Sequence, residues 1–358
     1  MANGLAGELA IWSLGLVALS LVAVPIHPQN MDQQSRHAII LPLELVAGQP
    51  ATLAVLTADG YIAPNTKVVL SNGQVVTTDE SGRAHFLVPL DVGIMFAQIL
   101  GAEVREAADV LPQPSTDSSL QVTRIPKMVS LENRFAISGN GFEGDADRNR
   151  VTMDGRDILV LASSPTQLIV MPAANLPPGP AKLTITEGPA ETVTDLTLVA
   201  LVFMNSSDVK IHRGGRAEIV LLARGTEEPL DLKVQNLSPQ TVQFAHANEA
   251  YVRTTGGPGN SAVLQLKGKS EGSFTFAISL ESAPVKGNVA VARDFLEAAQ
   301  KMAASDAANR IEKVLKELHG KGIDVAKMRS DLQNIPTQSG SPDFQALIRA
   351  SLRALNDE

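Results

Sequence analysis

The sequence predicts a mainly β protein, with several antiparallel β-sandwiches in tandem and a C-terminal α-helical segment. Three observations support this fold class. Between residues 38 and 290, short alternating or apolar segments recur at intervals of roughly 8–12 residues, separated by turn residues, with no helical period between them. From residue 291 onward the apolar residues change to helical spacing. The length of 358 residues exceeds one small domain and indicates two to four units.

The first element, residues 1–29, is predicted to be a signal peptide or an N-terminal anchor. Leu9–Val24 is uncharged and apolar, and it is somewhat shorter than the roughly 20 residues that span a bilayer. Glu8 precedes it and no basic residue does, so an uncleaved anchor remains the alternative to a cleaved signal peptide. A buried helix is less favoured because Pro25 and Pro28 follow. The chain is therefore expected to be exported to the periplasm, the cell surface or the medium.

Residues 38–111 form the first predicted sandwich. Lys67–Leu70 is a strand pattern that ends at Ser71-Asn72-Gly73, and Asn-Gly favours a type I′ hairpin turn. A second turn follows in the segment TDESGRA. The order of these segments, with the run VVLSNGQVVTTDESGRAHF, resembles the invasin-type bacterial Ig-like domains. That resemblance implies an Ig-like β-sandwich for this unit.

Residues 111–119 (LPQPSTDSS) are rich in Pro and Ser and predict a boundary before a second unit at 120–200. Within this unit, residues 139–144 (GNGFEG) match the G-x-G-x-x-G spelling of a dinucleotide-binding turn. Such a turn needs a strand before it and a helix after it, because the helix N-terminus holds the phosphates. The segment RFAISG before it is a strand pattern, but VTMDG after it predicts another strand and turn. The acidic Asp145 and Asp147 would also repel a phosphate. These glycines are therefore expected to shape a tight loop between strands.

The second unit resembles the IPT/TIG domains, which have an Ig-like fold. The resemblance covers nearly all of 120–200 and depends on the SGNGF element with Gly139, Gly141 and Phe142, on Val151 with Asp154-Gly155, and on the segments SSPTQLIVMPA and LPPGPAKLTI. Membership would imply the fold but no single activity.

Residues 201–290 predict a third, generic Ig-like sandwich, with about seven strand patterns. The chain contains no cysteine, which excludes the disulfide core of antibody-type domains and thiolate metal sites. The complete fold class is therefore tandem Ig-like β-sandwiches with a C-terminal α-helical segment.

Residues 291–358 form the predicted helical segment. Its apolar residues lie at helical spacing: Phe295, Leu296, Ala299, Met302, Ile311, Val314, Leu315 and Leu318. Ser305 or Asp306 can cap a second helix, and Ser341-Pro342-Asp343 predicts the start of the last one. Each helix has one apolar stripe, which is expected to pack on a neighbouring helix; a partner protein is the alternative.

Composition and motifs argue against several functional classes. The net charge is −8 and the basic residues are scattered, so nucleic acid is not an expected partner. No H-E-x-x-H motif occurs, and no G-x-S-x-G elbow or S-x-x-K motif is placed on a strand-to-helix turn. No enzyme activity, catalytic residue, cofactor or metal is therefore expected. The spacing Asp145-x-Asp147-x-Asn149 is typical of a calcium loop, but Arg150 and Arg156 occupy positions that need Gly and Glu. Solvated loop acids are therefore the favoured interpretation.

The expected function is a non-catalytic, exported binding, adhesion or scaffold module at the bacterial cell envelope. The sandwiches are expected to form a rod that presents loops and strand edges to a protein or a cell-surface polymer. A membrane partner is expected only through an uncleaved N-terminal anchor. Two loops, 139–149 and 254–260, are the candidate ligand contacts; their residues are Asn140, Phe142, Asp145, Asp147, Asn149, Gly257 and Asn260. The alternatives are an accessory subunit of a polysaccharide- or protein-processing assembly and a hydrolase with a site between domains.

Overall fold

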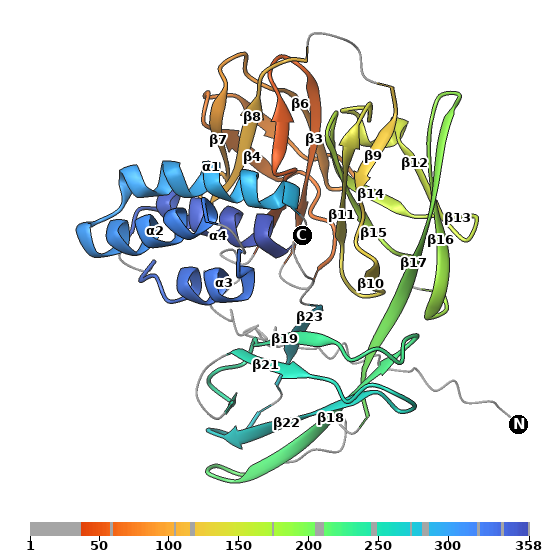
Figure 1. The fold of residues 1–358 in the computed structure, drawn as a ribbon, viewed down its shortest axis with the longest axis vertical. Coiled ribbons are helices and arrows are strands. Elements are labelled where there is room, and N and C mark those ends of the chain that lie inside the picture. Colours follow the sequence, from red (N-terminus) through yellow and green to blue (C-terminus); the bar gives the residue numbers. More distant parts are fainter. Residues whose placement is uncertain are drawn as a thin grey trace, which may run out of the picture.

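The computed structural model confirms a mainly β chain with a C-terminal helical segment (Figure 1). It describes residues 37–57, 60–103, 105–114, 119–173, 175–204, 211–244, 249–272, 274–280, 286–320, 323–337 and 340–356. The predicted signal peptide or anchor at 1–29 lies outside these residues. Over the described ranges, none of the helices combines the length and the apolar character that a membrane crossing requires.

The first sandwich is built from the first eight strands. These are β1 (Ala38–Ile40), β2 (Glu44–Val46), β3 (Pro50–Leu56), β4 (Lys67–Leu70), β5 (Val75–Thr77), β6 (Arg83–Leu87), β7 (Gly93–Ile99) and β8 (Arg105–Leu111). One layer contains β1, β3 and β6, and the other has the order β2-β8-β7-β4-β5. Alternate residues of each strand, such as Leu53, Phe86 and Met95, fill the core between the layers.

The β4–β5 hairpin confirms the strand prediction, but the predicted type I′ turn is wrong. Gly73 takes a φ of 85°, whereas Asn72 has no positive φ. The Asn72 side chain instead accepts a hydrogen bond from the Gln74 N–H at 3.0 Å, and the Gly73 N–H bonds to the Leu70 carbonyl. A side-chain amide that bonds its own backbone stabilises a turn without the left-handed conformation at both central residues.

The second sandwich uses the next nine strands. These are β9 (Gln121–Arg124), β10 (Met128–Ser130), β11 (Phe135–Asn140), β12 (Arg150–Met153), β13 (Arg156–Asp157), β14 (Leu159–Ser164), β15 (Gln167–Met171), β16 (Gly179–Glu187) and β17 (Ala190–Phe203). Its core lies between the layer β14-β15-β11-β9 and the layer β13-β12-β16-β17, to which β10 adds by parallel pairing with β17. Ile137, Leu168 and Leu183 are among its fully buried side chains.

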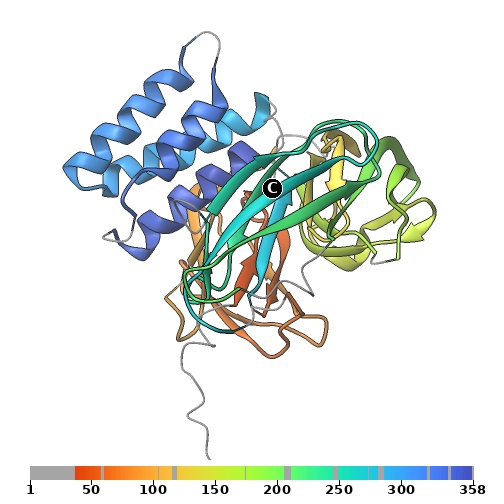
Figure 2. The same ribbon diagram turned by 90° about the horizontal axis from the view of Figure 1, so that it is seen from below.

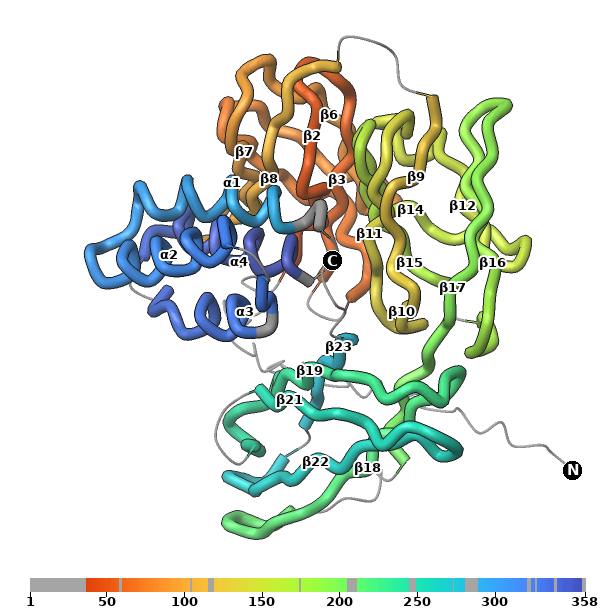
Figure 3. Tube along the Cα trace, in the orientation of Figure 1, coloured from red at the N-terminus to blue at the C-terminus, as the bar shows by residue number. Residues whose placement is uncertain are grey.

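The third sandwich shares a strand with the second. β17 has 14 residues, pairs with β16 over most of its length, and then pairs with β18 from Ala200 to Phe203. Figure 3 shows this strand running from one sandwich into the other. The remaining strands are β18 (Arg216–Arg224), β19 (Asp231–Asn236), β20 (Val242–Gln243), β21 (Glu249–Arg253), β22 (Ser261–Gly268) and β23 (Phe276–Leu280). A single strand common to two cores couples the two sandwiches through the backbone.

Four helices follow the sandwiches. They are α1 (Lys286–Met302), α2 (Ser305–Leu318), α3 (Val325–Gln333) and α4 (Pro342–Asn356). The Ser341 hydroxyl accepts a hydrogen bond from the Phe344 N–H at 3.2 Å, which confirms the predicted start of α4. The predicted cap of α2 is wrong, because Ala304 occupies the N-cap and makes no side-chain bond.

The apolar stripes of the helices pack on one another and on the first sandwich (Figures 1 and 2). Phe295, Ile311 and Phe344 share one buried cluster with Ala107 of β8, and Ile94 and Phe96 of β7 pack against it. The alternate residues Met95 and Ala97 of β7 face the opposite way, into the sandwich. Of the predicted stripe residues, Met302 departs from the cluster and is exposed.

Ion pairs hold α4 against the outer face of β8. Glu106 lies 2.9 Å from the Arg353 guanidinium and 3.6 Å from that of Arg349, and Arg105 pairs with Asp343. Arg349 also donates to the main-chain carbonyl of Arg105 at 2.5 Å. The helices are thus a fixed part of the molecule that covers one face of the first sandwich.

The expected rod arrangement is wrong for the first two sandwiches, which lie side by side (Figure 1). Thr52 of β3 pairs with Ser163 of β14, so one sheet runs through both sandwiches. Ile40, Ala54 and Ile169 belong to a small apolar cluster at this junction. The junction arises because β3 buries residues on both of its faces.

Candidate functional site at the junction of the first two sandwiches

The junction is lined by the outer face of β6. Because side chains alternate along a strand, Ala84 and Phe86 enter the core of the first sandwich while Arg83, His85 and Leu87 face outward. Arg83 is covered by the second sandwich, whereas His85 and Leu87 remain exposed. The loop from Gly141 to Asn149, which follows β11, approaches this face from the second sandwich.

Gly144 brings that loop into direct contact with β3. A Cβ atom at this position would lie 1.9 Å from the Pro50 carbonyl oxygen, so only glycine permits the approach. The Gly144 carbonyl accepts hydrogen bonds from the Thr52 and Ser163 hydroxyls, both at 2.7 Å. The Ala146 N–H donates to the Thr52 hydroxyl oxygen at 3.1 Å. All of these groups are buried, which makes the contact part of the core of the junction.

The chain after Gly144 forms a single 3₁₀ turn, Ala146–Arg148, and then enters β12. The Asp145 side chain caps this turn by accepting from the Asp147 N–H at 3.0 Å. A dinucleotide fingerprint needs a full helix at this point, so the prediction of a bend between strands is confirmed. The short 3₁₀ turn was not predicted.

Arg83 connects the two sandwiches through its guanidinium group. Nη1 donates to the Val160 carbonyl at 3.2 Å, and Nη2 lies 2.5 Å from Oδ1 of Asp147. The Arg83 side chain is almost fully buried, while the Asp147 side chain is exposed. A buried cation without a partner is costly, so Asp147 stabilises the buried position of Arg83.

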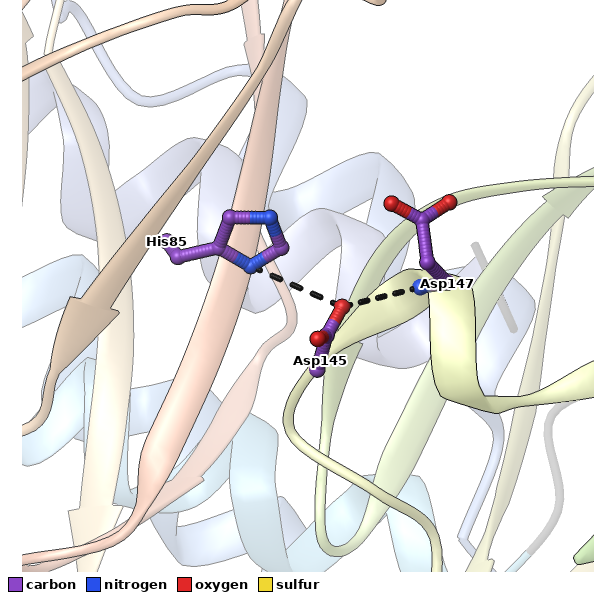
Figure 4. A group of neighbouring side chains, drawn as sticks. All are labelled: His85, Asp145 and Asp147. Atoms are coloured by element: carbon purple, nitrogen blue, oxygen red, sulfur yellow. Dashed lines mark hydrogen bonds and ion pairs between the residues drawn. The ribbon is translucent and has the colours of Figure 1, made fainter.

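His85, Asp145 and Asp147 lie close together beside this ion pair, and the Asp145 carboxylate faces the His85 ring and the Asp147 main-chain N–H (Figure 4). Nδ1 of His85 lies 3.8 Å from Oδ1 of Asp145, and one ligand atom from each of the three residues lies within 4.8 Å of the others. The Thr52 hydroxyl oxygen is 3.0 Å from Nδ1 of His85. The three side chains are 47%, 42% and 62% exposed, so solvent reaches the group. One imidazole and two carboxylates can form an ion pair or ligate a metal ion.

The other predicted contact residues of this loop lie in different environments. Phe142 is buried in the core of the second sandwich. Asn149 is buried and uses its amide within the loop, accepting from the Glu143 N–H and donating to the Glu143 and Asp145 carbonyls. Its side chain is therefore not arranged as the third ligand of a calcium loop. Asn140 is half-buried at the end of β11. Their role in ligand contact remains a prediction.

The 254–260 loop lies in the third sandwich, away from this group. Asn260 is buried, and its amide bonds the Gly256 N–H and the carbonyls of Thr226 and Glu228. Gly257 is half-buried with a φ of 69°, and its N–H donates to the Glu227 carbonyl. The structure thus does not bring the two predicted contact loops together.

A small cavity lies elsewhere in the third sandwich, beside β20. Its volume is about 200 Å³, and Thr241, Ser270, Glu271 and Phe274 contribute to its lining. Ligand pockets commonly have volumes of roughly 300–1,000 Å³. The cavity is therefore smaller than a typical ligand pocket, and the junction is the preferred candidate for a functional site.

A second acidic group lies between the first sandwich and α1. Burial, and then repulsion by the Asp294 carboxylate of α1, raises the pKa of Asp109 from 3.8 to about 6. Burial also raises the pKa of Glu44, against the opposing attraction of Arg124. Deprotonation of these carboxyls adds repulsion toward Asp294 and so affects the packing of α1. The two carboxyls are separate from the His85 group.

Sequence reasoning missed His85, Thr52 and Arg83. His85 precedes the nearest partner acid by 60 positions, and no spacing motif links them. The available signal was the segment ATLAVL of β3, which is apolar on both faces and so predicts burial on both sides. That signal predicts that another part of the chain covers the outer face of β3 and β6. It does not identify which loop provides the contact.

Comparison with known proteins gives no family assignment. No family model matches the chain, and no curated protein matches it. The resemblances to IPT/TIG and invasin-type domains therefore remain predictions.

Similar solved structures include SGBP-B of a Bacteroides ovatus mixed-linkage glucan utilization locus, in complex with a mixed-linkage heptasaccharide. It is 12% identical, with 66% of this chain and 72% of that chain covered and a TM-score of 0.26. The full extracellular region of plexin A4 is 12% identical, with 72% and 24% covered and a TM-score of 0.27. The I9–I11 tandem of titin is 11% identical, with 68% and 94% covered and a TM-score of 0.19. Scores this low do not establish a common arrangement, and the fold assignment comes from the strand pairing of this chain.

Proposed function

We propose that this chain is a non-catalytic binding or scaffold module exported to the bacterial cell envelope, with a protein or a cell-surface polymer as its partner. Buried contacts join the three sandwiches and the helical segment. Such a rigid arrangement is expected of a scaffold protein that holds a binding surface in a fixed position. The contacts involve the backbone as well as side chains: Leu43 donates its N–H to Gln167 at 2.6 Å, and Ser164 donates to the Glu44 carbonyl at 2.8 Å.

The observation that supports a binding role is the placement of exposed apolar side chains. Among the described residues, seven of the fifteen large exposed hydrophobic residues belong to the first sandwich: Tyr61, Ile62, Val75, Leu87, Leu90, Val92 and Leu100. Leu87 is the last residue of β6, Leu90 and Val92 lie in the turn before β7, and Leu90 is 81% exposed. Exposed apolar side chains that lie close together, as these three do in sequence, are typical of interaction sites, whereas single exposed ones are ordinary. We name Leu87–Val92 the β6–β7 turn surface.

Contact through this surface is favoured over addition of a partner strand at β5 or β13. β5 and β13 lie at the ends of their sheets and contain three and two residues. A strand of that length offers few backbone groups to a partner, and short edges are a common means of preventing edge pairing.

The test combines localisation with surface substitution. Cell fractionation with mass spectrometry of the mature N-terminus is expected to find the chain in the envelope or the medium. Leu87→Ser, Leu90→Ser and Val92→Ser together are expected to release it from the envelope fraction without unfolding it. Val193→Ser with Val263→Ser, which alters exposed valines outside the first sandwich, is the control. Intact Met1 in the soluble cytosol would contradict the export proposal, and equal retention of both variants would contradict the binding surface.

A further inference from the structure

We propose that His85, Asp145 and Asp147 bind one divalent transition-metal ion, which bridges the first and second sandwiches. This departs from the expectation of no metal that the sequence motifs suggest. His85 comes from β6 of the first sandwich, and both aspartates come from the loop of the second. An ion held by all three would tie two domains together, in addition to the Arg83–Asp147 pair.

The distances are close to those of a metal site. Ligand atoms at about 2.1 Å from an ion lie about 3.0–3.4 Å apart when adjacent and about 4.2 Å apart when opposite. The 3.8 Å between Nδ1 of His85 and Oδ1 of Asp145 falls between the adjacent and the opposite values, and the largest separation in the group does not exceed 4.8 Å. Because the Thr52 hydroxyl donates its proton to the Gly144 carbonyl, Nδ1 of His85 is the donor in its contact with Thr52, and an ion bound at Nδ1 replaces that hydrogen bond. Because all three side chains are partly exposed, small rotations can close the remaining gap.

The loop that carries the aspartates is already fixed in place. Gly144 is bonded to Thr52 and Ser163, and Asn149 bonds Glu143 and Asp145 through its side-chain amide. Ligands held by other contacts lose little conformational freedom on binding an ion. Arg83 bonds one carboxylate oxygen of Asp147, which leaves the second oxygen of that group for an ion.

The donor set selects the class of metal. Ca²⁺ and Mg²⁺ prefer oxygen ligands only, whereas one imidazole nitrogen with two carboxylates suits Zn²⁺, Co²⁺ or Mn²⁺. Three protein ligands with solvent access leave positions for water, so binding is expected to be weaker than in a closed structural zinc site. Zn²⁺ is accordingly the first probe, and Ca²⁺ is the probe for selectivity.

Isothermal titration of the full chain with ZnCl₂, after removal of metals with EDTA, is expected to show one ion per chain and no comparable binding of CaCl₂. His85→Ala and Asp145→Asn are each expected to raise the Kd by at least about tenfold. Asparagine also caps helical turns, so Asp145→Asn removes the ligand charge while preserving the cap. His319→Ala and Asp157→Asn, which change exposed groups elsewhere, are matched controls with no expected change.

Co²⁺ provides a readout that does not depend on the heat of binding. The visible absorption of bound Co²⁺ reports its ligands, and His85→Ala is expected to change or remove that spectrum while His319→Ala leaves it unchanged. Far-UV circular dichroism verifies that each variant is folded. The proposal is overturned if wild-type protein binds no Zn²⁺, or if folded His85→Ala and Asp145→Asn bind it as the wild type does. Loss of the Co²⁺ spectrum in His319→Ala would place the ion elsewhere and also overturn it.

Discussion

Gly144→Ala is expected to destabilise the junction of the first two sandwiches by about 2–6 kcal/mol. The new Cβ would lie 1.9 Å from the Pro50 carbonyl oxygen and 2.4 Å from its carbon, whereas C···O contacts are normally no shorter than about 3.3 Å. The backbones must therefore separate by more than about 1 Å, which breaks the hydrogen bonds from Thr52 and Ser163. Strain of about 1–3 kcal/mol and a buried carbonyl without partners, at about 1–3 kcal/mol, give the total.

Urea denaturation followed by far-UV circular dichroism measures this loss, and hydrogen exchange locates it in β3 and β14. Gly155→Ala is the matched control: Gly155 has a φ of 76° and open space around its Cβ position, so alanine there is expected to cost only about 1 kcal/mol. Equal losses for the two variants would refute the close-approach argument. Faster exchange in the third sandwich, with none in β3 or β14, would refute the assignment of Gly144 to this junction.

Three further outcomes are expected. Glu106→Gln should lower the free energy of unfolding by about 2–3 kcal/mol, because it weakens both ion pairs to α4. The rate of hydrogen exchange in α4 should rise in this variant, and the control Glu191→Gln should show neither effect. Because the pKa of Asp109 is raised to about 6, the stability that its protonated form contributes is complete below pH 3.8 and is lost as the pH rises through about 6. In Asp109→Asn, the urea midpoint should therefore vary less with pH between these values. Asn260→Ala should lower the free energy of unfolding, measured by urea denaturation, by about 2–3 kcal/mol because buried hydrogen bonds are lost, and an unchanged stability would contradict this structural role.

Local structure was largely predictable because local chemistry determines it. The strand segments of the three sandwiches and the start of α4 follow from alternation, turn residues and capping. The type of the β4–β5 turn was not predictable from Asn-Gly alone. An asparagine side chain can either accept a left-handed conformation or bond its own backbone, and Asn72 does the second.

The side-by-side packing of the first two sandwiches was not predicted, because it depends on contacts between segments far apart in the chain. Thr52 and Ser163 have small polar side chains that are equally suited to a solvated strand face, yet both are buried at the junction. The candidate site has the same origin, since His85 meets Asp145 only when the sandwiches pack. The apolar outer faces of β3 and β7 indicated covered surfaces, but period-two patterns do not identify what covers them.

The spelling GNGFEG arises here from three separate needs of the backbone. A Cβ at Gly139 would lie 2.3 Å from the Gln121 carbonyl oxygen, Gly141 has a φ of 78°, and Gly144 approaches Pro50. In a dinucleotide-binding turn the same letters allow a tight turn and close approach to a phosphate. Glycine at these positions therefore indicates only that the backbone lies against other atoms or takes a left-handed conformation. The residues that follow distinguish the two cases, and here they form one 3₁₀ turn and a strand, while Gly144 packs against Pro50 of the neighbouring sandwich.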